Sequence, residues 1–195
     1  MSNGDYLVRG ATLICTNGSH KRRINLPKCH GVYVGMHPVL HELECLSEPF
    51  CDRETCNITP FGVCVPTEGC PPTETKIYKK TKNNSKDGKV GTVEGYQCMP
   101  TIVGKWMNTY PYTRIIDNGD KAFDRTLMYV GREMPYGQST LTTRSFLVCK
   151  YGGIISPIDS GQCTQVYENE FYSPDDYLTL QSMFLQQIDL RSDWS

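Results

Sequence analysis

Short apolar segments separated by turn residues run along most of this chain. The segment Tyr6 to Ser19, YLVRGATLICTNGS, ends its apolar part at Cys15 and enters a turn of Asn and Gly. The segment Phe146 to Ser156, FLVCKYGGIIS, repeats the order with Cys149, two glycines and two isoleucines. Glycine adopts positive φ without a Cβ penalty, and Val and Ile favour strands. Each pattern therefore predicts a strand that delivers a cysteine to a tight turn.

Further strand patterns follow the same spacing. Residues 31–40, GVYVGMHPVL, alternate apolar and polar positions and contain Gly and Pro, which predicts a hairpin. Strand character returns in Tyr96–Met107, Tyr110–Ile116, Leu127–Val130 and the segment that begins at Tyr136. About eight to ten short strands at this spacing are typical of an all-β domain. We therefore expect a mainly β fold of short strands and hairpins, without parallel βαβ units.

The middle of the chain has a different character. Residues 41–72 contain five prolines and five cysteines with little periodicity, which predicts a looped segment; the cysteines are Cys45, Cys51, Cys56, Cys64 and Cys70. Residues 76–91, KIYKKTKNNSKDGKVG, are almost wholly polar, and a segment of this composition buries too little apolar surface to order itself. We expect an exposed excursion here and favour a solvated loop over a basic patch for an anionic partner.

The C-terminal tail carries helix signals that the rest of the chain lacks. Ser173 is an N-cap, Pro174 takes the first helical position, and two aspartates follow in the first turn. Apolar residues then recur at helical spacing on one face; they are Tyr177, Leu180, Phe184 and Ile188. These signals predict a helix from about Pro174 to Leu190. We expect a β domain over residues 1–165 and a helical extension over 166–195.

Size and charge exclude several classes of protein. A chain of 195 residues can bury a real core, so its size alone demands no disulfide or metal. Asp5 and Arg9 interrupt the N-terminus, and no apolar run approaches membrane-spanning length, so we expect a protein made in the cytoplasm without a signal peptide. The net charge is −1, and basic residues cluster only at 21–23 and 76–89. Nothing in this pattern indicates a nucleic-acid surface.

Ten cysteines are a high count for this length, and they allow three interpretations. They are metal ligands in a cytosolic protein, disulfides in an exported one, or buried core thiols. An enzyme is the weaker interpretation: Cys149 could be drawn as a nucleophile with His30 or His37 as its base, but any chain with this composition permits such a drawing. No Ser elbow, phosphate loop or HExxH motif is present, so we expect no catalytic activity.

A series of short motifs occurs in a recognisable order. It consists of RGATLIC at 9–15, GSH at 18–20, LP at 26–27, CHGVYVG at 29–35, FGVC at 61–64, QCMP at 97–100, GKW at 104–106, LVCKYGGIIS at 147–156 and GQ at 161–162. In order and spacing the series resembles the PAAR-like proteins, divergent relatives of the PAAR-repeat spike tips of type VI secretion systems and related contractile injection machines. The resemblance extends from Tyr6 to Gln162. The sequence departs from the family pattern in the polar excursion, in the middle cysteines and in the longer spacing after Trp106.

The resemblance implies a fold and a role. The fold would be a small tapered, conical β domain. It would cap and sharpen a trimeric VgrG-type β-helical spike, with one copy per trimer, and help the spike to puncture a membrane during a transient contact. Such a protein is assembled on the injection apparatus and expelled with it. The C-terminal helix would be a possible attachment point for an effector or other cargo.

The resemblance also implies a metal ion near the point. Four of the cysteines on the motifs are each expected to begin or end a strand; they are Cys15, Cys64, Cys98 and Cys149. We expect this set to bind a structural Zn²⁺, with His30 and Cys45 as reserve ligands. Because no CxxC pair is present, the site must be assembled from distant turns. The competing interpretation is a secreted, disulfide-stabilised structural or adhesive β protein.

Overall fold

The computed structural model describes residues 4–52, 54–80, 91–116, 127–130 and 137–163. The contacts divide the chain into two units, residues 1–164 and 165–195. The second unit lies outside the described residues, and with it the helix expected from Pro174 to Leu190. Within the described ranges, no helix has the length and hydropathy needed to cross a membrane.

The described part of the chain is mainly β, as the apolar pattern predicts. Its strands are short and belong to four small sheets. In chain order they are β1 (Thr12–Cys15), β2 (Arg22–Arg23), β3 (Tyr33–Val34), β4 (His37–Pro38), β5 (Val63–Cys64), β6 (Thr75–Lys80), β7 (Gly91–Gln97), β8 (Tyr110–Ile116), β9 (Leu127–Val130), β10 (Gln138–Thr140), β11 (Leu147–Val148) and β12 (Ile154–Pro157).

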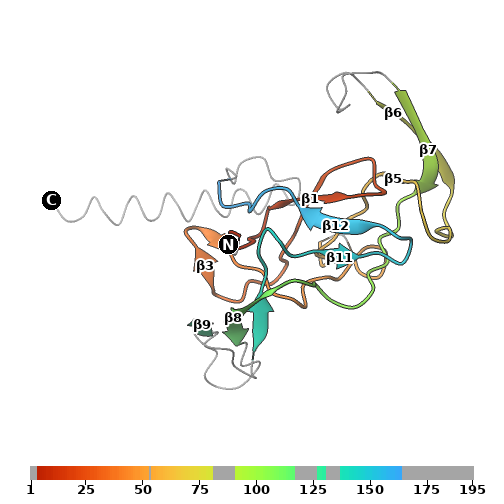
Figure 1. The fold of residues 1–195 in the computed structure, drawn as a ribbon. Coiled ribbons are helices and arrows are strands. Elements are labelled where there is room, and N and C mark those ends of the chain that lie inside the picture. Colours follow the sequence, from red (N-terminus) through yellow and green to blue (C-terminus); the bar gives the residue numbers. More distant parts are fainter. Residues whose placement is uncertain (1–3, 53, 81–90, 117–126, 131–136, 164–195) are drawn as a thin grey trace. The chain divides into compact units, whose positions relative to one another are not determined.

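One antiparallel sheet joins the two ends of the first unit, in the order β11-β12-β1-β2 (Figure 1). Leu13 of β1 pairs with Pro157 of β12, and Cys15 pairs with Ile155. Ile155 also pairs with Leu147 across the glycine turn, which confirms the predicted strand, turn and strand of residues 146–156. The two segments that each carry a strand and a cysteine therefore lie side by side.

The other sheets are smaller. β3 and β4 form the hairpin predicted within residues 31–40, with Tyr33 opposite Pro38 and Val34 opposite His37. A second sheet has the order β10-β8-β9, and a third has the order β5-β7-β6. The strands predicted at Tyr110–Ile116 and Leu127–Val130 are β8 and β9.

Two expectations need correction. The polar excursion expected at 76–91 begins as strand β6, which pairs with β7 along its whole length, because a partner strand satisfies its backbone groups where apolar burial would not. Ile77 is nevertheless 63% exposed, and residues 81–90 lie outside the described ranges. The strand expected at Tyr96–Met107 ends at Gln97. Beyond Gln97, only single bridges at Ile102 and Met107 tie the segment to residues 146–149.

The core is built from residues of almost every segment. Its largest buried side chains include Trp106, Phe61, Leu7, Leu13, Ile24, Leu40, Leu141, Leu147 and Ile155. Cys64 and Cys98 belong to the same cluster, and Cys15 and Cys45 pack against it. These four thiols therefore lie in or against the core, together with the aliphatic side chains. The interior is also the place where a ligand set assembled from distant turns would meet.

Candidate functional site

The four cysteines expected as zinc ligands lie at the ends of four different strands. Cys15 is the last residue of β1, and Cys64 is the last residue of β5. Cys98 directly follows β7, and Cys149 directly follows β11. Each cysteine therefore leaves the regular ladder where the chain begins to turn. We call this set the four-cysteine junction.

Backbone hydrogen bonds connect the segments that carry these cysteines. Gly18 forms a bridge with Cys64, and its N–H donates to the carbonyl of Cys15 at 3.1 Å. The N–H of Cys98 donates to the carbonyl of Gly62 at 2.8 Å. These bonds hold the ends of β1, β5 and β7 next to one another.

The glycine turn completes the junction from the other side. The N–H of Cys149 donates to the carbonyl of Gly153 at 2.8 Å, which closes the turn between β11 and β12. A Cβ placed on Gly153 would lie 2.8 Å from Cys15 Sγ and 3.7 Å from Cys149 Cβ. Contacts below 3.0 Å are essentially never made by real Cβ atoms. Only glycine lets this backbone pass so close to the two cysteines.

Burial raises the pKa values of three of these thiols. The pKa of Cys98 is raised to about 12, chiefly by burial; a backbone hydrogen bond at Phe61 lowers it, and the nearby Cys64, Cys15 and Cys149 raise it. Burial, followed by Cys15 and Cys149, raises the pKa of Cys64 to about 11. Burial also raises the pKa of Cys15. The raised pKa values keep the metal-free thiols of Cys15, Cys64 and Cys98 protonated at neutral pH.

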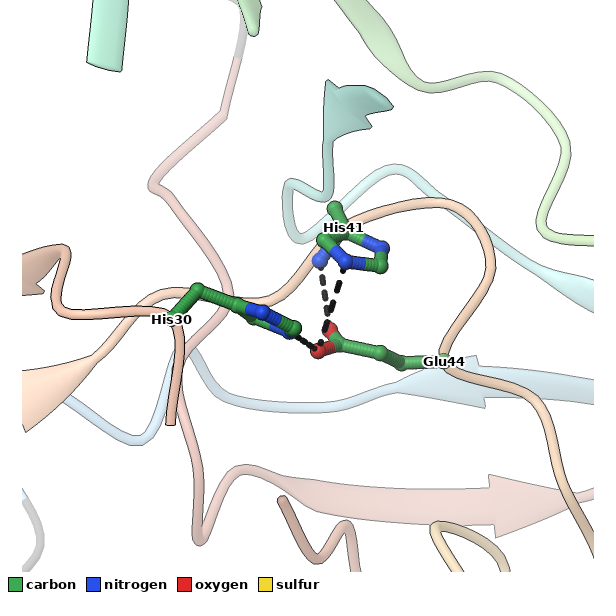
Figure 2. A group of neighbouring side chains, drawn as sticks. All are labelled: His30, His41 and Glu44. Atoms are coloured by element: carbon green, nitrogen blue, oxygen red, sulfur yellow. Dashed lines mark hydrogen bonds and ion pairs between the residues drawn. The ribbon is translucent and has the colours of Figure 1, made fainter. Parts of the chain in front are cut away.

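A second group of potential ligands combines His30, which lies before β3, with His41 and Glu44 of the loop after β4. His30, His41 and Glu44 each offer one ligand atom, and these atoms all lie within 4.8 Å of one another (Figure 2). Their side chains are 12%, 8% and 7% exposed, respectively. Among the described residues this is the group that reaches such a spacing, and it contains no cysteine. The four-cysteine site therefore stays a prediction.

The carboxylate of Glu44 is the centre of this group. One of its oxygens, Oε1, hydrogen-bonds His30 Nε2 and lies 3.8 Å from His41 Nε2. The other oxygen, Oε2, accepts the backbone N–H of His41 at 2.6 Å. The two imidazole rings stack with their centroids 4.4 Å apart. Figure 2 shows both rings meeting the same carboxylate from different sides.

Backbone contacts fix two of the three residues. The N–H of Glu44 donates to the carbonyl of His41 at 3.1 Å, which closes a turn. The indole Nε1–H of Trp106 donates to the carbonyl of Glu44 at 2.8 Å. Because Trp106 is 1% exposed, this bond anchors the turn to the core. His41 and Glu44 are thus held in place before any ion arrives.

Of the two reserve ligands, His30 lies in the histidine and glutamate group and Cys45 does not. His30 joins His41 and Glu44, whereas Cys45 directs its Sγ toward the carbonyls of Leu43 and Gly104, each at 3.6 Å. Sequence reasoning missed His41 and Glu44. The available signal is the HELE stretch, which places a histidine and a glutamate three residues apart, but the low periodicity of residues 41–72 predicts only a looped segment.

Residues 7–127 match the family model described as a domain of unknown function, DUF4280. The chain belongs to the DUF4280 family. The DUF4280 region contains Cys15, Cys64 and Cys98 together with the whole His30, His41 and Glu44 group, while Cys149 lies beyond it. Neither the comparison with curated proteins nor the comparison with solved structures gives a match.

Proposed function

We propose that this DUF4280 protein is a PAAR-like spike tip. It caps and sharpens the end of a trimeric VgrG-type β-helical spike in a type VI secretion or related contractile injection system. The ordered motifs between Tyr6 and Gln162 suggest this role. The observation that carries it is that backbone contacts and the glycine turn hold the strand ends with Cys15, Cys64, Cys98 and Cys149 next to one another.

A tip that punctures a membrane needs rigidity. A four-coordinate Zn²⁺ that ties strand ends together would add rigidity to the core cluster to which Cys64 and Cys98 belong. The donor set suits this ion, since four thiolates form a closed structural site. Cys15, Cys64, Cys98 and Cys149 would hold the ion, and binding would release the protons that burial keeps on the sulfurs.

The described residues also offer an apolar surface for contact with a spike. The loops 42–47 and 100–107 lie side by side, because Trp106 hydrogen-bonds the backbone of both Glu42 and Glu44 and Ser47 Oγ donates to the carbonyl of Pro100. Exposed apolar side chains on these loops are Leu43, Leu46, Val103 and Met107. We propose that they form part of the base that meets the spike, with one asymmetric copy on each trimer.

The remaining features of the proposal follow from this role. The protein acts by shape and rigidity rather than by catalysis, contacts the target membrane transiently, and carries cargo, if any, through residues 166–195. The described cysteines are free thiols. Thiols kept reduced in the cytosol, where such machines are loaded, are compatible with zinc.

The test is to mix the purified chain with a VgrG-type trimer and to weigh the complex by native mass spectrometry. One copy per trimer is expected. Replacing Leu46, which is 59% exposed, by Asp should weaken binding strongly, because it introduces a charge into the apolar base. Ile77→Asp is the matched control, since Ile77 is equally exposed but lies on β6. Three copies per trimer, or no binding at micromolar concentration, would contradict the proposal.

A further inference from the structure

We propose that His30, His41 and Glu44 form a second metal site that binds a divalent first-row transition ion, with Zn²⁺ as the representative ligand. The site is separate from the four-cysteine junction, and it does not depend on the role as a spike tip. Three potential ligand atoms within 4.8 Å of one another, on side chains that are almost completely withdrawn from water, are the observation that motivates it.

The donor atoms select the class of ion. Two imidazole nitrogens and one carboxylate oxygen suit Zn²⁺ and its first-row neighbours, whereas Mg²⁺ and Ca²⁺ prefer shells made of oxygen alone. Three protein ligands also leave one position of a tetrahedral ion open to water or to another small ligand. The site therefore differs in chemistry from a closed shell of four thiolates.

The present spacing is close to that of a loaded site. Around a tetrahedral ion with bonds of about 2.0–2.1 Å, neighbouring ligand atoms lie about 3.3 Å apart. His41 Nε2 and Glu44 Oε1 are 3.8 Å apart, and His30 Nε2 is in hydrogen-bond contact with the same oxygen. Small rotations of the side chains are enough to place the three atoms around one ion.

The charge balance favours a cation at this place. The carboxylate of Glu44 is 7% exposed, and a buried carboxylate needs a compensating positive charge. Glu42, the acidic neighbour in the same turn, already pairs with Lys105 at 2.6 Å. A divalent ion at this place would supply the positive charge.

Coordination requires one change at His41. The backbone N–H of Leu43 donates to His41 Nδ1 at 3.3 Å, so a neutral ring carries its proton on Nε2. Binding of the ion through Nε2 moves the proton to Nδ1 and breaks this long hydrogen bond. The change of tautomer is a signature of coordination that a purely structural histidine would not produce.

A bound ion would also connect two parts of the chain. The turn of His41 and Glu44 is anchored to the core by Trp106 and by the N–H of Glu42, which donates to Ser139. His30 belongs to a segment in which Lys28, Cys29 and Gly31 are exposed, just before β3. The ion would fasten this surface segment to the anchored turn.

Co²⁺ titration of the reduced full-length chain tests the site, with bound ions counted by native mass spectrometry. His30→Asn and Glu44→Gln should each weaken one binding event by at least about tenfold, since even partners outside the coordination shell can cost 10–100-fold. His37→Asn is the matched control, because His37 lies on β4 outside the group, and it should bind like the unmodified chain. The readout is a difference between variants, so it does not depend on whether the four-cysteine junction binds metal.

Spectra separate the two sites. His30→Asn should leave any thiolate-to-cobalt charge-transfer band unchanged, because no sulfur belongs to the histidine site. In the unmodified chain, nitrogen NMR at saturating Zn²⁺ should show the His41 proton on Nδ1, a measurement that needs no variant. Equal binding by His30→Asn and the unmodified chain, an equal loss in His37→Asn, or an unchanged His41 tautomer would each overturn the proposal.

Discussion

The four-cysteine junction and the His30, His41 and Glu44 group are two opposite ways of collecting potential ligands. The junction draws Cys15, Cys64, Cys98 and Cys149 from four strands spread over most of the described chain. The second group comes from a single stretch of fifteen residues, 30–44. The first therefore depends on strand ends from several sheets, whereas the second depends on the segment of His30 and on one turn held by Trp106 and Ser139.

This difference determines how much of the fold a bound metal ion would stabilise at each site. A site made of distant strand ends exists only after the sheets have formed, so an ion bound there stabilises the global fold. A site made of one turn exists with much less of the fold in place, so an ion there stabilises a local segment. The three predictions below test this contrast at the two sites.

Removing a ligand from the junction should have the largest effect. In the zinc-loaded protein, Cys149→Ser should lower the free energy of unfolding by about 3 kcal/mol or more, which for a chain of this length is a fall of roughly 6–12 °C in melting temperature. Cys70→Ser is the control, because Cys70 is exposed and surface changes stay within about 0.5 kcal/mol. If the purified protein contains no metal and a chelator leaves its melting temperature unchanged, the junction does not stabilise the fold through a metal ion.

In the metal-free protein, the two sites should make the free energy of unfolding depend on pH in opposite ways. The junction should lose its contribution at alkaline pH, and the histidine group should lose its contribution at acid pH. Folding raises the pKa of Cys64 and Cys98 from 9.0 to about 11 and about 12, so the unfolded chain loses these protons first. Their contribution is complete below pH 9.0 and is lost as pH rises through the folded values. Folding lowers the pKa of His41 below 6.5, so its contribution is complete above pH 6.5 and is lost on acidification.

Urea unfolding as a function of pH measures both limbs. The alkaline loss should be on the order of a few kcal/mol and the acid loss smaller. His41→Gln should flatten the acid limb and leave the alkaline limb in place, while Cys98→Ala should do the reverse. If either substitution alters both limbs equally, the two regions are not independent.

A single methyl group at Gly153 should disturb only the junction. Its Cβ would approach Cys15 Sγ to 2.8 Å, so Gly153→Ala should cost about 1–3 kcal/mol through overpacking. Gly91→Ala is the control, since a Cβ there meets nothing within 4 Å. Thermal unfolding gives the stabilities, and Co²⁺ titration should show that the histidine site is unaffected. Equal costs for the two variants would mean that the backbone beside Cys15 has room to move.

Local chemistry explains which elements could be predicted from the sequence. Val and Ile favour strands, and two consecutive glycines favour a turn. The strand, turn and strand of residues 146–156 could therefore be predicted from local sequence, and the pairing of β11 with β12 confirms them. The polarity of residues 76–80 pointed to a loop, because single-residue properties do not reveal that β7 supplies a partner strand. His41 and Glu44 were missed for a similar reason. Their turn is anchored by Trp106, far away in the sequence, and no periodicity announces that contact.

The pairing of β1 with β12 also has a consequence for the order of events during synthesis. Leu13 faces Pro157, and β12 is the last of the described strands to leave the ribosome. At about 5–20 residues per second, β1 waits on the order of ten seconds for its neighbour. During that time its hydrogen-bonding edge is open to other nascent chains. Closure of this sheet is therefore a late event, completed only when nearly the whole first unit has been made.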